Sequence, residues 1–204
     1  MHMTVQEAIA RRRSIRSFTG APLTQAQLNT LLDAARLAPS SLNSQPWRFK
    51  VLTGAEDKAW LAGSVSRQQG LFTSAGAVLL CCADISGYLK ESAASVQAYV
   101  DSGFTGPVME GIKDYLTVEQ ASARERLRAA GAMNVALAVS QMMLQAVELG
   151  LGTCWVGMFG EDAIKARFGL GEELAVIALL AVGVPAGEHP GPATRKPLDA
   201  ILLP

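Results

Sequence analysis

Two stretches of strand length are apolar almost from end to end. Ala77–Ala83 reads Ala-Val-Leu-Leu-Cys-Cys-Ala, and Leu174–Val184 contains no polar side chain. A strand that is apolar on both sides is stable only when both of its faces are covered. The two stretches therefore predict strands that are buried on both faces inside a layered fold.

Other segments predict helices that alternate with further strands. Arg48–Thr53 has the alternating pattern of a strand, and Thr153–Val156 is a shorter one. Thr4 and Thr24 each begin a capping box, with Glu or Gln three residues later, and such boxes open helices. The expected helices cover about Thr4–Arg11, Thr24–Leu37, Glu56–Ser66, Val118–Ala130, Met133–Leu149 and Glu161–Phe168. This order predicts a single layered domain of the α+β or α/β class over residues 1–204.

The longest apolar stretch, Ala129–Gly150, raises the question of a membrane span. Polar residues are spread along its whole length, at Asn134, Ser140, Gln141, Gln145 and Glu148. A span through lipid seldom carries so many polar groups. We therefore expect a buried central helix and no membrane association.

The composition excludes several classes of protein. Lys and Arg number 18 and so do Asp and Glu, so the formal net charge is zero and an extended nucleic-acid surface is not expected. No spacing of Cys and His matches a metal site. Cys81, Cys82 and Cys154 lie in apolar stretches and are expected to be small buried hydrophobes. Met1-His2-Met3 is set aside as a cloning remnant or mis-set start, and without a signal peptide we expect a cytoplasmic protein.

The segment from about Gly87 to Leu116 has no clear periodicity. Glycine and proline interrupt it at Gly103, Gly106, Pro107 and Gly111. We expect an irregular lid or insertion at about residues 87–116. Its aromatic residues fit stacking on a substrate and equally fit packing; they are Tyr88, Tyr99, Phe104 and Tyr115.

The turn Arg12-Arg13-Ser14-Ile15-Arg16 brings three guanidinium groups within five residues. Such groups repel one another unless an anion neutralises them, and the planar fork of Arg suits phosphate oxygens. The same cluster is also typical of a solvated basic helix end, which the helix dipole favours. The turn alone does not decide between the two interpretations.

A second polar segment follows, Pro39-Ser40-Ser41-Leu42-Asn43-Ser44-Gln45-Pro46-Trp47. Its short hydrogen-bonding side chains are able to line a polar ligand such as a ribityl chain, although ordinary turns use the same residues. Together with the Arg-rich turn and with Gly150-Leu151-Gly152-Thr153-Cys154-Trp155-Val156-Gly157, it resembles the nitroreductase family of flavoproteins. The resemblance implies an α+β fold, a three-layer α/β/α sandwich whose central, mostly antiparallel sheet is flanked by helices.

The resemblance also implies FMN as cofactor and assigns roles to several residues. Arg12 and Ser14 would bind the phosphate, with Arg13 beside them, and Arg16 would reach the pyrimidine edge of the flavin. The segment Val156-Gly157-Met158 would approach flavin N5, where glycine lets the main chain come close. An amide facing the pyrimidine is expected at Gln68 or Gln69, with Gln69 preferred.

Two further features of the family concern a second subunit. Pro39, Ser40, Ser41 and Asn43 resemble the loop that comes from the partner, which implies a homodimer with FMN at the interface. The apolar end Ile201–Leu203 looks strand-like and would wrap onto the neighbour as an exchanged tail. Arg195 or Lys196 would then close the phosphate site; the alternative for both is a surface pair in a flexible tail.

These implications lead to an expected activity. The chain would transfer hydride from NAD(P)H through flavin N5 to a small oxidised acceptor, such as a nitroaromatic or a quinone. No side chain is expected to act as catalyst, because the flavin carries the chemistry. A specialised relative remains an alternative: a dehalogenase, a flavin-fragmenting enzyme or a heterocycle oxidase. A non-catalytic FMN-binding module and a phosphate-binding protein without flavin are further alternatives.

Overall fold

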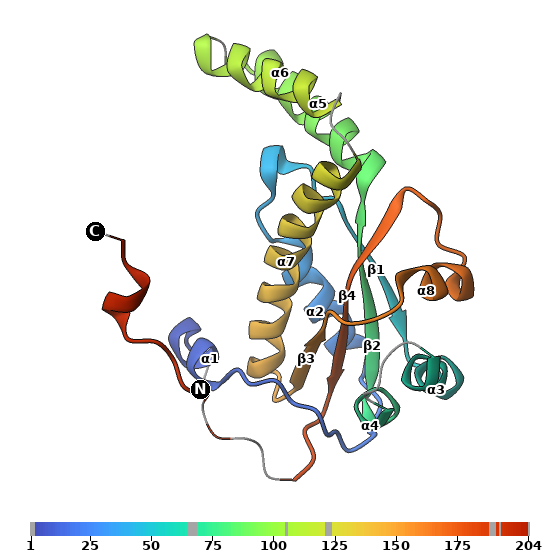
Figure 1. Cartoon of the computed structure of the whole chain (residues 1–204). Helices are drawn as coiled ribbons and strands as arrows, with labels where there is room; N and C mark the ends of the chain where they lie inside the picture. The colour runs from blue at the N-terminus through green and yellow to red at the C-terminus, as the bar shows by residue number, and fades with distance from the viewer. Residues whose placement is uncertain are drawn as a thin grey trace.

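The computed structural model describes residues 3–64, 69–104, 106–120, 124–187, 191 and 193–203. At its centre lies a four-stranded sheet in the order β1-β2-β4-β3, in which each neighbouring pair is antiparallel (Figure 1). The strands are β1 (Trp47–Leu52), β2 (Ala77–Asp84), β3 (Gly152–Val156) and β4 (Leu174–Gly183). The two apolar stretches are the two central strands, which confirms that they are buried on both faces.

Helices cover both faces of this sheet (Figure 1). One face is packed by α2 (Gln25–Arg36) and α7 (Arg124–Glu148). The other is packed by α3 (Ala55–Ser64), α4 (Gln69–Ser74) and α8 (Glu161–Phe168). α1 (Val5–Arg11) lies against α7, and both predicted capping boxes are formed. The α+β, three-layer arrangement is therefore confirmed; the short helix α4 was not predicted.

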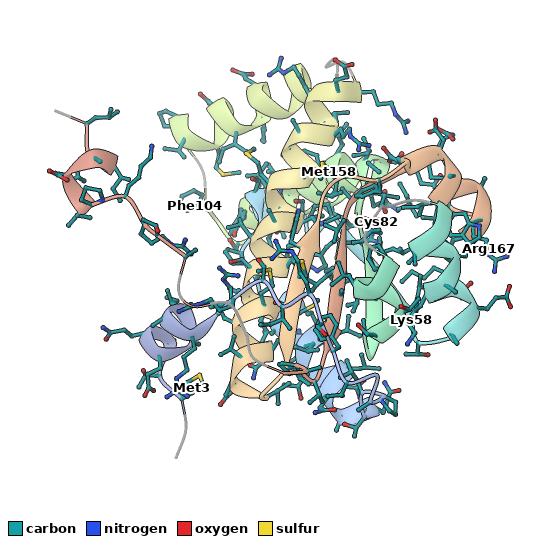
Figure 2. All side chains as sticks on the ribbon, turned by 60° about the horizontal axis from the view of Figure 1, so that its bottom comes forward. Met3, Lys58, Cys82, Phe104, Met158 and Arg167 are labelled. Atoms are coloured by element: carbon teal, nitrogen blue, oxygen red, sulfur yellow. The ribbon has the colours of Figure 1, made fainter. Side chains whose placement is uncertain are left out.

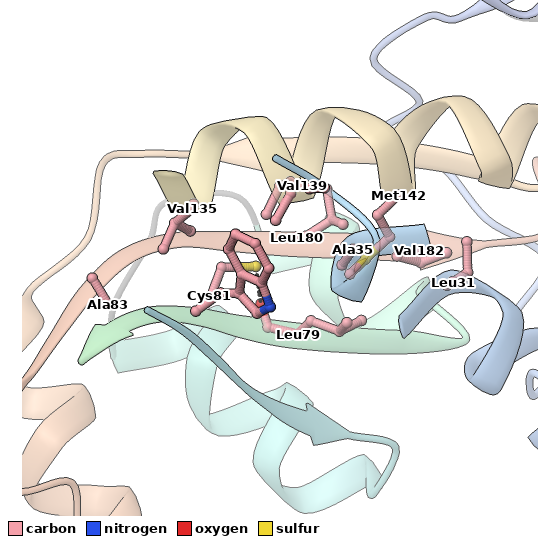
Figure 3. Packing of buried hydrophobic residues seen from close by; sticks show 14 of the residues in the cluster. Leu31, Ala35, Leu79, Cys81, Ala83, Val135, Val139, Met142, Leu180 and Val182 are labelled. Atoms are coloured by element: carbon pink, nitrogen blue, oxygen red, sulfur yellow. Dashed lines mark hydrogen bonds between the residues drawn. The ribbon is translucent and has the colours of Figure 1, made fainter. Parts of the chain in front are cut away.

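Alternate side chains of β2 enter different cores. Leu79 and Cys81 face α2 and α7, where Val139 and Leu180 belong to the same cluster (Figure 3). Cys82 and Cys154 lie in the cluster on the other face. Burial raises the pKa of all three cysteines, that of Cys82 to about 11, so the thiols stay protonated at neutral pH. The cysteines are buried and unpaired, as predicted.

The prediction of two helices around Gly131 was wrong, because α7 runs without a break from Arg124 to Glu148. A Cβ on Gly131 would lie 2.9 Å from the Cβ of Ala83 in β2. The glycine is therefore a point of close approach between helix and sheet, and the surrounding packing stabilises the helix there. By length and composition α7 is able to cross a membrane. Its inner face belongs to the main core, so the expectation of a central core helix holds.

The irregular segment expected at 87–116 is helical instead. α5 (Ile85–Asp101) begins at Asp84, whose carboxylate accepts the amide of Gly87 at 2.6 Å. α6 (Pro107–Gln120) begins with proline, which suits the first position of a helix. Gly103 and Gly106, with φ of 88° and 110°, form the turn between the helices. The result is a helical hairpin that projects from the body (Figure 1); its role as a lid stays a prediction.

The C-terminal tail runs away from the body (Figure 1). Leu198–Ile201 forms one 3-10 turn, so the strand expected near the end is not present. A strand needs a neighbour with which to pair, and the tail touches no sheet edge within the described chain. Its apolar side chains are exposed; they are Leu198, Ile201, Leu202 and Leu203.

Hydrogen bonds connect an irregularity in the pairing of β2 with β4 to the helices α7 and α8. The pairing shifts between Cys81 and Cys82, and the amide of Val176 opposite donates to Glu161 Oε1 at 2.8 Å. Arg128 of α7 donates to the same carboxylate at 2.9 Å and also to the carbonyl of Val176 at 3.3 Å. Glu161, the first residue of α8, thereby joins α7, α8 and β4.

Glu161 should contribute stability in a pH-dependent way. Burial raises its pKa, but the hydrogen bonds from Arg128 and Val176 and the charges of Arg128 and Lys165 outweigh burial and hold the pKa below its ordinary value of 4.5. The stabilisation is complete above the unfolded-state pKa and is lost as the pH falls through the folded-state pKa. We expect Glu161→Gln to lower the free energy of unfolding by about 1–3 kcal/mol at neutral pH. In denaturant titrations the difference in unfolding free energy between Glu161→Gln and wild type should narrow as the pH falls below 4.5. A difference that widens as the pH falls contradicts this assignment.

Candidate functional site

The Arg-rich turn lies beside β3, at one edge of the sheet. α1 ends at Arg11, and the amide of the next residue, Arg12, still donates to the carbonyl of Ala8 at 2.9 Å. Ser14 then pairs with Thr153 in a parallel bridge, and the Ile15 amide donates to the Thr153 carbonyl at 2.9 Å. The turn is therefore held by main-chain hydrogen bonds that do not depend on its charged side chains.

Gly152 explains why the turn can approach β3 so closely. A Cβ on this residue would lie 2.6 Å from Cγ1 and 2.8 Å from Cβ of Ile15. Ile15 is buried in the core beneath β3, with a residue exposure of 6%. The missing methyl group at position 152 is thus what allows Ile15 to enter the core and fixes Ser14 and Arg16 on either side of it.

The guanidinium groups of the turn do not share one role. Arg13 folds back and donates to the carbonyls of Ala10 at 2.6 Å and Arg12 at 2.8 Å, where the helix C-terminus favours a cation. Arg16 is exposed, and its contact with the Ser14 carbonyl is long at 3.4 Å. In the described chain no carboxylate forms an ion pair with Arg12, Arg13 or Arg16. Uncompensated guanidiniums beside a serine hydroxyl are a donor set that fits a phosphate.

The segment that follows β3 is open to solvent on its outer side. Val156 ends the strand and is buried, whereas Gly157 is exposed and Met158 reaches 79% exposure. Figure 2 labels Met158 on this loop. A Cβ on Gly157 would meet only Trp155 Nε1, at an ordinary 3.5 Å. Packing within the chain therefore does not require glycine at this position.

The loop from Pro39 to Gln45 has an unusual backbone. Leu42, Asn43 and Gln45 all have positive φ values, 50°, 50° and 43°. The Gln45 amide donates to Ser40 Oγ at 3.0 Å, which closes the loop from within. Its exposed groups include Pro39, Ser41 and Asn43.

Asn134 holds this loop against α7 and was missed as a site residue. Its Oδ1 accepts the Ser41 amide at 2.9 Å, and its Nδ2 donates to the carbonyl of Ala130 at 2.9 Å. Asn134 is 1% exposed. An amide side chain in an apolar helix was the available signal, but it served only to argue against a membrane span.

The turn and the loop lie at diagonally opposite corners of the sheet. Ser14 bridges to Thr153 on the β3 edge, level with Ala77 at the start of β2. The loop leads into Trp47 on the β1 edge, which pairs with Ala83 near the other end of β2. At about 3.3 Å per residue and about 4.8 Å per strand, they are separated by about 20 Å along the strands and about 14 Å across. One chain does not bring them together.

The remaining predicted residues have different positions. Gln68 lies outside the described residues, and Gln69 is the first residue of α4. The end of α4 is tied to the chain just beyond the Arg-rich turn, because Ser74 accepts the amides of Phe18 and Gly20. Arg195 and Lys196 are exposed in the tail, and among the residues that the structure describes Arg195 donates only to the carbonyl of Thr194.

Substitution of Gly152 tests the close approach of the turn. Gly152→Ala should displace Ile15 and lower the free energy of unfolding by about 1–3 kcal/mol, the usual effect of overpacking. Hydrogen exchange of the Ile15 amide should accelerate more than that of the central strands. Gly63→Ala is the matched control, because a Cβ there meets nothing within 4 Å and alanine favours the helix. Equal effects of the two substitutions would rule out this role of Gly152.

Comparison with known proteins agrees with the geometry. The family model "Nitroreductase family" matches residues 9–184. A Bacillus subtilis protein named as an NAD(P)H nitroreductase, YdgI, is 32% identical and covers 96% of this chain and 94% of its own. A Thermus thermophilus protein named NADH dehydrogenase is 30% identical, over 98% of this chain and 96% of its own.

The fold is also shared with a solved structure that contains the cofactor. A protein from Exiguobacterium sibiricum, named as a nitroreductase and solved in complex with FMN, superposes with a TM-score of 0.81. It is 26% identical, and the match covers 98% of this chain and 96% of that one. The family match over most of the chain, the identity and the shared fold lead to one conclusion: this chain belongs to the nitroreductase family.

Proposed function

We propose that this protein is an FMN-dependent oxidoreductase that uses NAD(P)H to reduce a small oxidised acceptor, such as a nitroaromatic or a quinone. The observation that carries the proposal is the Arg-rich turn, in which Arg12, Ser14 and Arg16 are fixed on the β3 edge and no described carboxylate forms an ion pair with either arginine. The names of the relatives and the FMN complex of a structural neighbour support it. A protein with this activity would work in the cytoplasm, where reduced nicotinamides are available.

Different residues of this chain would then bind different parts of the cofactor. Arg12 and Ser14 would bind the phosphate, while Arg13 holds the turn itself through the carbonyls of Ala10 and Arg12. When bound, the flavin supplies the redox chemistry by accepting hydride at N5 and releasing electrons to the acceptor. Arg16 would place a positive charge at the pyrimidine edge and stabilise negative charge there. The exposed Gly157 and Met158, after Val156, would lie against the ring; Gln69 or Gln68 would face the pyrimidine.

We infer that each site is shared by two copies of the chain. The turn and the loop with Pro39, Ser40, Ser41 and Asn43 are too far apart within one chain, so a second copy would supply the loop. Apolar groups exposed on α1 and α7 and in the tail provide surface for such a homodimer; they are Val5, Ile9, Met133, Leu137, Ile201 and Leu202. An exchanged tail would bring Arg195 or Lys196 to the partner's phosphate.

The visible spectrum of the purified protein tests the activity. Yellow protein should bleach when NADH or NADPH is added without oxygen, and the colour should return when a quinone or nitroaromatic is added. Protein that takes up no FMN would refute the proposal. Flavin that is bound but reduced by neither nucleotide would instead identify a non-catalytic FMN-binding module.

Complementation tests the shared site. Arg12→Ala alone should weaken FMN binding about ten- to hundredfold, because one charge-assisted phosphate contact is lost. A chain carrying Ser41→Ala and Asn43→Ala should also bind FMN weakly. In the mixed dimer, one site receives both altered parts and the other site receives neither, so one of the two sites recovers wild-type affinity.

The matched control pairs Arg12→Ala with Ser14→Ala, since both changes lie in the same turn and every site then contains one damaged part. FMN titration of the purified mixed dimers gives the result. Recovery in the control pair, or none in the turn-and-loop pair, would mean that the site is not divided between the copies in this way.

A further inference from the structure

Leu42 adopts a backbone conformation that leucine rarely occupies. Its φ and ψ are 50° and 31°, in the left-handed region. A residue with a bulky side chain is disfavoured there relative to glycine or asparagine, so the surrounding structure must hold it. Leu42 lies between Ser41 and Asn43, which the proposed function assigns to the flavin.

The contact that holds Leu42 comes from the α5–α6 hairpin. Val96 of α5 and Met109 of α6 are only 4% and 3% exposed and form a small core of their own, separate from the cores on the two faces of the sheet. Leu42 packs against this core together with Val100 and Ile112. Of the residues in this cluster, Leu42 alone comes from the loop; the others come from the hairpin.

A cavity also adjoins the loop at the same place. Its volume is about 350 Å³, and it is lined by Asn43, by Ser95, Ala98 and Tyr99 of α5, and by Ser102, which directly follows that helix. α5 therefore lies beside the exposed side of Asn43 as well as behind Leu42.

The polar contacts of the loop run in the other direction, toward α7 and within the loop. The Ser41 amide is held by Asn134, the Ser44 amide by the Ser41 carbonyl, and the Gln45 amide by Ser40 Oγ. Two main-chain bonds span Leu42, from the Asn43 amide to the Ser40 carbonyl and from the Ser44 amide to the Ser41 carbonyl, both at 3.0 Å. Bonds between residues three apart close right-handed and left-handed turns alike, so they do not themselves select a left-handed leucine. If the apolar contact is lost, Leu42 is free to return toward a favoured region and must carry Ser41 and Asn43 with it.

We propose that Leu42 is a positioning residue, through which the α5–α6 hairpin holds the flavin-binding loop in its binding conformation. The hairpin then acts on the affinity for the cofactor from a distance, by supporting the backbone of the loop. This inference rests on the proposed FMN function for its consequence, but its structural part concerns the loop alone.

Three truncations test the inference: Leu42→Ala in the loop, and Val96→Ala and Met109→Ala in the hairpin. Each should weaken FMN binding about fivefold or more, a loss equivalent to about 1 kcal/mol, measured by quenching of flavin fluorescence. In the protein without flavin, hydrogen exchange of the Ser44 and Gln45 amides should accelerate. Leu42→Met keeps the apolar contact and should restore both readouts toward wild type.

Two controls separate this effect from general loss of stability. Leu170→Ala removes a half-buried leucine, and Val78→Ala a buried valine, from the core on the other face of the sheet. They should lower the melting temperature while FMN affinity stays within about twofold of wild type.

Leu42→Asn adds an independent check, because asparagine tolerates the left-handed region without packing on the hairpin. It should recover part of the affinity that Leu42→Ala loses. Wild-type affinity and unchanged exchange in the two hairpin variants would overturn the inference. If wild type itself binds no FMN, the proposed function fails, and the exchange of the Ser44 and Gln45 amides still decides whether the hairpin holds the loop.

Discussion

Burial of β2 and β4 on both faces is the constraint on which the rest of the structure depends. Both strands are apolar along nearly their whole length, so helices must cover the sheet on either side. The polar exception is Asp84 at the end of β2, and its carboxylate is occupied by the start of α5 and by Arg48 of β1. The polar groups that are able to bind a ligand consequently lie at the edges of the sheet. The Arg-rich turn pairs with β3 at one edge, and the Ser- and Asn-containing loop leads into β1 at the other.

Local patterns predicted much of this fold, and the errors have identifiable causes. The capping boxes at Thr4 and Thr24 and the apolar strands depend on neighbours in sequence or on composition, and they were correct. Glycine was interpreted too simply. Gly103 and Gly106 do interrupt helices, at a tight turn, whereas Gly131 lies inside one because the sheet approaches it there. The tail was expected to be a strand, but a strand requires an edge with which to pair, and the described tail reaches none.

From the sequence the candidate site could be proposed as a set of residues and not as an arrangement. Motifs selected Arg12, Ser14, Arg16, Ser41 and Asn43 as candidates, and their roles stay predictions; no motif indicates that the two groups lie at opposite corners of the sheet. Nor does sequence show that Arg13 is engaged by the end of α1. The two groups also differ physically. The turn is held by main-chain pairing and a buried isoleucine, whereas the loop stores backbone strain and depends on side chains from α5, α6 and α7.

Gly131 brings α7 close to the sheet, because a Cβ at this position would lie 2.9 Å from the Cβ of Ala83. α7 is thereby located against the sheet at Gly131. One turn further along α7, Asn134 accepts the Ser41 amide of the loop. Beyond the C-terminal end of α7, the chain reverses through Gly150 and enters β3 at Gly152. A fixed number of α7 residues therefore lies between the point that binds the loop and the point where the chain enters β3 beside the Arg-rich turn. An insertion or deletion within α7 would change this number and rotate one of these points relative to the other, while leaving the side chains of the loop and the turn intact.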